Sequence, residues 1–354
     1  MSATKPEELS VRKVLQLPES TIAVAISPTA RRIACGGHGR GQAEWIEVVT
    51  LDEPDQRFRL VHTFFGHTGG IRSLAWHPGE LALVSGSWEP AGKVRIWPLH
   101  DSAVESGGVA LSIGEHRDSV TSVVFSHFGG SVWSSSSGFG KTIHKHEFHG
   151  DGMWDGTRDV GREVAVVAAD EKATYGYYDV EISHDHRFAG AIRVDKTDRC
   201  WLEVREFGKP SELVAEQECR GMSFSWRIDR PAVVFETVEG TLVEWCVDSG
   251  EVVSLNGFES TGKPLDTVVC GPSGRVAALG DVDGDEPAVR VSLYGLPVGS
   301  SVGGELLGFA AVKAGSCKEA RFAPDGRLLF ATFDDQLFEV SSRQRMDTGA
   351  KQSD

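Results

Sequence analysis

Residues 64–78 read FFGHTGGIRSLAWHP, and KVRIW follows at residues 93–97. A Gly-His pair stands directly before an alternating apolar stretch, and a tryptophan ends the later stretch. Alternation of this kind over a few residues predicts a half-buried β-strand. If the passage recurs at a fixed period, the repeat determines the architecture of the whole chain.

Seven segments repeat a short apolar stretch, a polar turn and a second stretch rich in Val, Leu and Ala. They read AISPTARRIACGG, AWHPGELALVSGS, VFSHFGGSVWSSS, EISHDHRFAGAIR, FSWRIDRPAVVFE, VCGPSGRVAALGD and RFAPDGRLLFATF. Their turns are anchored near Ser27, His77, Ser126, Ser183, Ser225, Gly271 and Ala323. The first and last anchors are 296 residues apart, a mean spacing of about 49, which is close to the period of propeller blades.

Two further strand-like stretches follow each pair, so each unit contains four predicted strands. The third stretches include EWIEV (44–48), VRIW (94–97), WLEV (201–204), LVEW (242–245) and LFEV (337–340). The fourth stretches include RFRLVHTF, VALSI, REVAVVAA, SELVAEQ, EVVSL and GELLGF. Helix-period stretches are scarce and the chain has 41 glycines, so we predict an all-β protein with seven four-stranded antiparallel units.

This pattern resembles the WD-repeat β-propeller family over essentially the whole chain, with degenerate motifs. In that family a His, a Ser or Thr, an Asp and a Trp form a hydrogen-bonded chain inside a blade. Unit two offers His67, Ser85 or Ser87, and Trp97 for these structural positions, and no acidic residue clearly fills the remaining one. Pro98 stands where the family has Asp, and unit three reads KTIHKHEF where the family has Trp. The resemblance implies a closed ring of seven blades.

A ring must be closed, and the two chain ends offer a way to close it. The last unit runs through LFEV and then becomes polar, so it lacks a fourth strand, whereas VRKVLQL (11–17) is a spare strand ahead of unit one. We predict that residues 11–17 complete the last blade beside Gln336–Val340. The expected organisation is a disordered tail at 1–10, a single propeller at 11–342 and a polar tail at 343–354.

Composition limits the class of partner and the compartment. The net charge is −15, from 51 acidic and 36 basic residues, which argues against nucleic acid or an anionic membrane as the main partner. The six cysteines form no CxxC pair, and the N-terminus MSATKPEELS has no apolar core of a signal peptide. We therefore expect a cytoplasmic protein that is monomeric outside a complex.

In the resembled family, loops joining the second and third strands of the blades line the top face. Here such loops are long at 36–43, 87–92, 136–141, 194–199 and 280–287. The residues we predict for a partner-binding surface are Arg40, Trp88, Phe139, Lys196 and Arg199, together with Tyr175 from DEKATYGYY (170–178). The alternative is that each aromatic residue packs onto its own loop. The insertion at 149–161 is expected on the opposite face, where Met153 and Trp154 either anchor it or contact a partner.

Two clusters could suggest a metal site, and both are incomplete. His144 and His146 point the same way on a strand and His149 follows, but no further ligand of fixed spacing is present. DVDGDE (281–286) has the Asp spacing of a calcium loop, but Gly284 is out of place and the distal Glu is missing. The triplet HDH (184–186) has the composition of a turn.

No motif of a hydrolase, a phosphate-binding loop or a metalloprotease occurs in the chain. The interpretation we favour is a non-catalytic scaffold or sensor that needs no cofactor and binds another protein or a peptide on the loop-rich top face. The alternative is a propeller enzyme with a small-molecule or metal site at the central channel.

Overall fold

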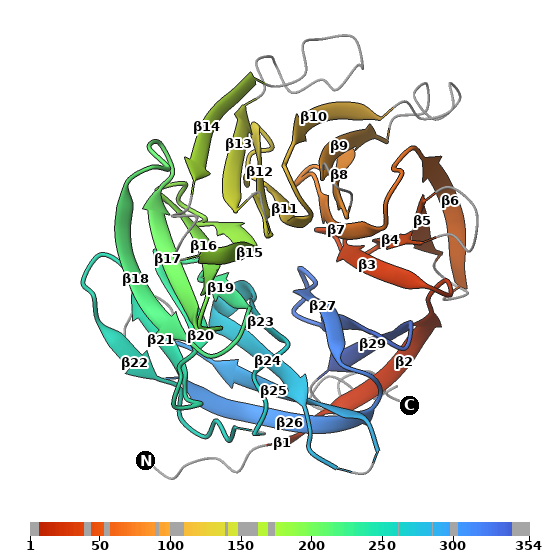
Figure 1. Ribbon diagram of the computed structural model, residues 1–354. Helices are drawn as coiled ribbons and strands as arrows, with labels where there is room; N and C mark the ends of the chain where they lie inside the picture. Colours follow the sequence, from red (N-terminus) through yellow and green to blue (C-terminus); the bar gives the residue numbers. More distant parts are fainter. Residues whose placement is uncertain are drawn as a thin grey trace, which may run out of the picture.

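The computed structural model describes residues 7–38, 44–52, 57–88, 92–99, 110–138, 141–147, 162–168, 174–260, 262–284, 286–297 and 304–341. These residues form seven antiparallel sheets arranged as blades around a central channel (Figure 1). The predicted all-β fold with seven four-stranded blades is confirmed.

The first three blades each use four consecutive strands, the first of which is innermost. Blade 1 contains β3 (Thr21–Ile26), β4 (Arg32–Gly37), β5 (Trp45–Asp52) and β6 (Arg57–Phe65). Blade 2 contains β7 (Ile71–Trp76), β8 (Ala82–Ser87), β9 (Lys93–Pro98) and β10 (Leu111–Glu115). Blade 3 contains β11 (Val120–Phe125), β12 (Ser131–Ser136), β13 (Thr142–Glu147) and β14 (Arg162–Ala168).

Blades 4 to 6 follow the same order. Blade 4 contains β15 (Thr174–Ile182), β16 (Phe188–Asp195), β17 (Cys200–Glu206) and β18 (Leu213–Cys219). Blade 5 contains β19 (Phe224–Trp226), β20 (Ala232–Glu236), β21 (Leu242–Cys246) and β22 (Val252–Ser254). Blade 6 contains β23 (Thr267–Cys270), β24 (Arg275–Asp281), β25 (Ala288–Gly295) and β26 (Glu305–Lys313), with the 3-10 turn η1 (Pro272–Gly274) between its first two strands. Among the described residues, no helix has the length and apolarity needed to cross a membrane.

The serine anchors of the sequence repeat close the turns between first and second strands. The Ser126 hydroxyl oxygen accepts a hydrogen bond from the Ser131 backbone N–H at 3.1 Å, and the Ser27 hydroxyl oxygen accepts one from the Arg32 N–H at 3.1 Å. The hydroxyl of Ser183 likewise accepts from the Phe188 N–H at 2.9 Å. A short polar side chain at this position therefore fixes the hairpin, which is why the repeat is visible there in the sequence.

The hydrophobic core lies between blades rather than within them. Buried apolar side chains of the described residues form seven clusters, and each cluster draws its members from two neighbouring blades. Trp97 of blade 2, for example, shares a cluster with Ile46 and Phe64 of blade 1. A single blade would expose both of its faces, so each sheet depends on its two neighbours for burial.

Hydrogen bonds also join the innermost strands around the ring. Each of these strands has one edge without a strand partner, and a side chain from the preceding blade caps a backbone N–H on that edge at five interfaces. With the donor named first, the bonds are Val123 N to Ser73 Oγ (3.0 Å), Val180 N to Ser122 Oγ (3.2 Å), Trp226 N to Glu181 Oε2 (3.3 Å), Cys270 N to Ser225 Oγ (3.1 Å) and Cys317 N to Asp266 Oδ2 (3.0 Å).

The other two interfaces use side-chain donors instead. Trp76 Nε1 donates to the Ala25 carbonyl at 2.8 Å between blades 1 and 2, and Lys318 Nζ donates to the Thr21 carbonyl between blades 7 and 1. The ring is therefore held at every interface by a hydrogen bond to an otherwise unpaired backbone group.

The seventh blade is closed by the N-terminus, as predicted. It contains β27 (Cys317–Phe322), β28 (Leu328–Thr332) and β29 (Gln336–Ser341), and β2 (Ser10–Gln16) pairs antiparallel with β29 in the register Val11 with Val340 (Figure 1). Leu17 follows β2 and is buried in the cluster shared by blades 7 and 1. The last blade thereby gains its outer strand from the opposite end of the chain.

The N-terminal segment continues beyond this closure. Residues 7–10, which the sequence assigned to a disordered tail, include strand β1 (Glu7–Glu8), which pairs parallel with β26. Leu9 is buried in the cluster between blades 6 and 7, and this burial holds the segment in place. Residues 1–6 and the tail at 343–354 lie outside the described residues.

Deletion of residues 1–18 should lower the melting temperature by roughly 10 °C or more, because it exposes the edge of β29 and empties the sites of Leu9 and Leu17. Thermal unfolding followed by circular dichroism measures this. The exposed substitution Lys13→Ala serves as a control and should leave the transition in place, while a peptide spanning residues 7–18 should restore part of the loss. An unchanged transition in the deletion variant would contradict closure by β2.

Candidate functional site

The three residues assigned to the family's hydrogen-bonded chain meet inside blade 2. His67 Nε2 lies 2.6 Å from Ser85 Oγ, and Trp97 Nε1 donates to the same oxygen at 2.8 Å. All three side chains are buried. Ser87, the alternative, instead accepts from the Lys93 backbone N–H at 3.1 Å, so Ser85 occupies the position.

Blade 3 carries a variant of this arrangement. His116 Nε2 lies 2.8 Å from Ser134 Oγ, as His67 does from Ser85. The strand position of Trp97 is held by His146, which faces Val132 in the same way that Trp97 faces Leu83. His146 is completely buried against Gly114, and neither of its ring nitrogens has a hydrogen-bond partner among the described residues. Burial lowers the pKa of His146 to about 4, so the ring is neutral at neutral pH.

Those predicted partner-binding residues that the structure describes lie on one side of the ring. Trp88 and Tyr175 are 65% and 55% exposed, and Lys196 is exposed at the tip of the β16–β17 turn. Arg199 is half exposed, but its guanidinium is held by Asp195 at 3.4 Å and lies over the Trp201 ring. Arg40 and Phe139 lie outside the described residues, as do Met153 and Trp154.

Two exposed apolar residues that were not singled out from the sequence, Ile22 and Phe333, lie on the same side of the ring as Trp88. We call Ile22, Trp88 and Phe333 the mouth patch. The Trp88 N–H donates to the Gly70 carbonyl at 2.8 Å, and the Ile22 side chain lies beside Gly70. Phe333 is 62% exposed, and its ring is 5.1 Å from Lys318 Nζ, the group that binds the Thr21 carbonyl. The three residues therefore come from blades 7, 1 and 2 and lie on one side of the ring.

The central channel contains a cavity with a volume of about 860 Å³. Alternate residues of the innermost strands face it, because successive side chains of a strand point to opposite sides. Most of these positions hold small or neutral side chains, among them Ala23, Ala25, Ser73, Ala75, Ser122, Val124, Ser225 and Val269.

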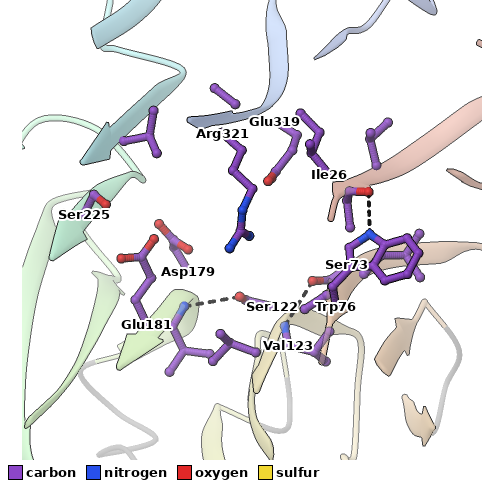
Figure 2. A pocket seen from close by; sticks show the side chains of 18 of the residues that line it. Ile26, Ser73, Trp76, Ser122, Val123, Asp179, Glu181, Ser225, Glu319 and Arg321 are labelled. Carbon is purple, nitrogen blue, oxygen red and sulfur yellow. Dashed lines mark hydrogen bonds between the residues drawn. The ribbon is translucent and has the colours of Figure 1, made fainter. Parts of the chain in front are cut away.

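Two blades on opposite sides of the ring place charges in this channel. Asp179 and Glu181 come from β15, and Glu319 and Arg321 come from β27. Figure 2 shows the Arg321 guanidinium extending into the cavity between Asp179 and Glu319. Asp179 has a left-handed backbone (φ 41°) at a register shift of β15, which turns its side chain toward the channel.

The channel perturbs the protonation of these groups, which meet channel water but lie away from bulk solvent. Burial raises the pKa of Asp179 to about 7 and that of Glu319 to about 8. Burial also raises the pKa of Glu181, and the Asp179 carboxylate raises it further. The same burial lowers the pKa of Arg321. The site is thus a mixed-charge cluster in which burial favours the protonated form of the carboxyl groups.

The described residues contain no group of three or more His, Cys, Asp or Glu side chains that could hold a metal ion. His144 packs against His116, with ring centroids 3.9 Å apart, and His149 lies outside the described residues. Asp281 and Asp283 of the calcium-like loop both face Lys263, at 3.7 and 3.8 Å. In the HDH turn, Asp185 accepts from the Ser183 hydroxyl and His184 stacks on His127.

Ser85→Ala should destabilise the protein by about 2–3 kcal/mol, because it removes the shared hydrogen-bond partner of two buried groups, His67 and Trp97. Ser87→Ala removes one backbone cap of the same blade and should cost about 1 kcal/mol. Urea unfolding measures both values. Equal effects of the two substitutions would contradict the role of Ser85.

Glu319→Gln should remove a pH dependence of stability. The native state holds the Glu319 proton up to about pH 8, whereas the unfolded chain releases it near 4.5, so stability falls as the pH rises between these values. The variant should gain roughly 2–4 kcal/mol over the wild type between pH 5 and pH 8. Urea unfolding across this range, with the exposed variant Glu286→Gln as control, measures the gain. Parallel curves for Glu319→Gln and wild type would contradict the burial of this carboxyl group.

Two comparisons with known proteins each match a part of the chain. The family model for the WD domain, G-beta repeat, matches residues 58–98, which cover β6 of blade 1 and the first three strands of blade 2. The chain is also similar to cell division cycle 20.6, cofactor of APC complex, from Arabidopsis thaliana, with 28% identity over 92 residues. That alignment covers 25% of this chain and 21% of the plant protein.

Proposed function

Because the chain is a WD-repeat β-propeller, we propose that it is a non-catalytic interaction module that binds another protein or a peptide on its top face. The top face is the side that carries the turns between second and third strands, together with the mouth patch. The plant relative is described as a cofactor of a complex, which supports a role in assembly for the shared fold.

The mouth patch is the observation that carries this proposal. Its three apolar side chains are 40%, 65% and 62% exposed, and they lie on the same side of the ring, where Ile22 and Phe333 border the channel. Met222, which is 52% exposed, also lines the channel near this rim. Exposed aromatic residues grouped beside a rigid rim are typical of protein-binding hot spots. The exposed apolar residues of the outer strands, such as Leu60 and Val252, are more scattered and carry less weight.

All six cysteines are free, and burial raises the pKa of Cys35 to about 12, so its thiol is unreactive at neutral pH. Free buried thiols support a reducing compartment, and we propose the cytoplasm.

Affinity purification from the native host, followed by quantitative mass spectrometry, tests the top face. The double variant Trp88→Ala/Phe333→Ala should lower recovery of a stoichiometric partner by about tenfold or more, because it removes the aromatic anchors of the mouth patch. The matched control is Phe128→Ala, which truncates an 82% exposed aromatic residue at a turn between first and second strands, on the opposite face. Recovery that is unaffected by the double variant, or lost only with Phe128→Ala, would refute binding at this face.

A further inference from the structure

Glu319 and Arg321 differ from the other polar residues of the channel. Ser73, Ser122 and Ser225 each accept a hydrogen bond from a backbone N–H of the next blade, so they stabilise the contacts between blades. The side chains of Glu319 and Arg321 make no hydrogen bond or ion pair to any described residue, although both lie deep in the channel. An arginine has five donors, and leaving them without protein acceptors away from bulk water is costly.

The opposite wall adds two further carboxyl groups. The Asp179 carboxylate receives the Phe224 backbone N–H and Glu181 receives that of Trp226, yet each keeps acceptor capacity toward the channel. With Glu319 they make three carboxyl groups against one guanidinium. A ligand that complements this cluster needs one anionic group and an excess of cationic groups.

The spacing of Glu319 and Arg321 restricts the chemical class of ligand that can bind. They are two residues apart on one strand and face the same side, which separates their backbone attachment points by about 7 Å. An ammonium group and a carboxylate on one carbon atom fit between such a pair, with the ammonium donating to Glu319 and the carboxylate accepting from Arg321. A second cationic group on the same molecule would reach the wall of Asp179 and Glu181.

We propose that the central channel is a binding site for a free α-amino acid with a basic side chain. Its α-carboxylate is held by Arg321, its α-ammonium by Glu319, and its side-chain cation by Asp179 and Glu181. The site goes beyond the proposed top-face docking and does not depend on it. The neighbouring hydroxyl groups of Ser73 and Ser122 accept from the backbone, so their protons are free to donate to the ligand carboxylate.

The cavity admits such a ligand. Its volume of about 860 Å³ exceeds that of one amino acid, and the small side chains Ala23, Ala25 and Ala75 leave the space between the charged walls open. Ile22, Met222 and Phe333 border the top end of the same cavity. A partner on the top face would therefore lie over this end of the channel.

Isothermal titration calorimetry with L-lysine on the full chain tests the proposal. Pentane-1,5-diamine lacks the carboxylate of lysine, and 6-aminohexanoate lacks its α-ammonium group. A pH of about 8 is suitable because Glu319 ionises there. The titratable groups that act on Glu319 are Arg321 on its own strand and Asp179 and Glu181 on β15, while His127 and His184 at the adjoining turns act on Arg321.

Lysine should bind at one site per chain, and each of the two analogues should bind about tenfold more weakly or worse. Arg321→Gln should abolish the preference for lysine over the diamine, and Glu319→Gln should abolish the preference for lysine over 6-aminohexanoate. Glu286→Gln, an exposed site, is the matched control and should bind like wild type. Unchanged melting temperatures at pH 5 verify that the channel variants are folded.

The absence of binding heat with lysine, or equal affinity for lysine and the diamine, would overturn the proposal. Lysine binding that survives both Arg321→Gln and Glu319→Gln would also overturn it. Either result leaves the purification experiment on the top face unaffected, so a failure here is distinguishable from a failure of the proposed function.

Discussion

The innermost strand of every blade has an edge that no other strand pairs, and the structure is organised around satisfying that edge. Backbone N–H groups along it would otherwise face a narrow channel away from bulk water. At five interfaces a side chain of one blade accepts a backbone N–H of the next, as Ser73 does for Val123. Together with the shared clusters of apolar residues, these bonds make each blade incomplete without its neighbours, so the ring must close. Strand β2 closes it by joining the two ends of the chain.

The need to cap these strand edges explains which residues line the channel, and it distinguishes the channel residues that have no capping role. A position that caps a neighbouring strand needs a side-chain acceptor, which Ser73, Ser122 and Ser225 provide. Blade 7 places Glu319 and Arg321 at such channel-facing positions without a capping role. Unsatisfied charged groups in a largely satisfied structure are the features most readily explained by binding. The proposed binding site therefore lies at Glu319 and Arg321, the channel-facing side chains that do not cap a neighbouring strand.

The seven blades could be predicted from the sequence because the patterns that indicate them are local. Turn serines such as Ser126, alternating strands and a spare N-terminal strand all appear within short windows of the chain. The pairing of β1 with β26 was missed because two residues of parallel strand carry no pattern. The channel charges were missed because Asp179 and Arg321 are far apart in the chain and meet only across the ring. A signal did exist: YDVEI and KEARF place charges at alternate positions of a first strand, where the other units have small residues. Arg40 and Phe139 stay predictions, because they lie outside the described residues.

Amide hydrogen exchange in the native state tests the central claim most directly. The amides of Val123, Val180 and Cys270 lie on unpaired strand edges, yet the account predicts that they exchange as slowly as amides of the central strands. It further predicts that Ser73→Ala accelerates exchange at Val123 while Val180 and Cys270 stay protected. Exchange of all three amides at the rate of exposed loops in the wild-type protein would contradict the account.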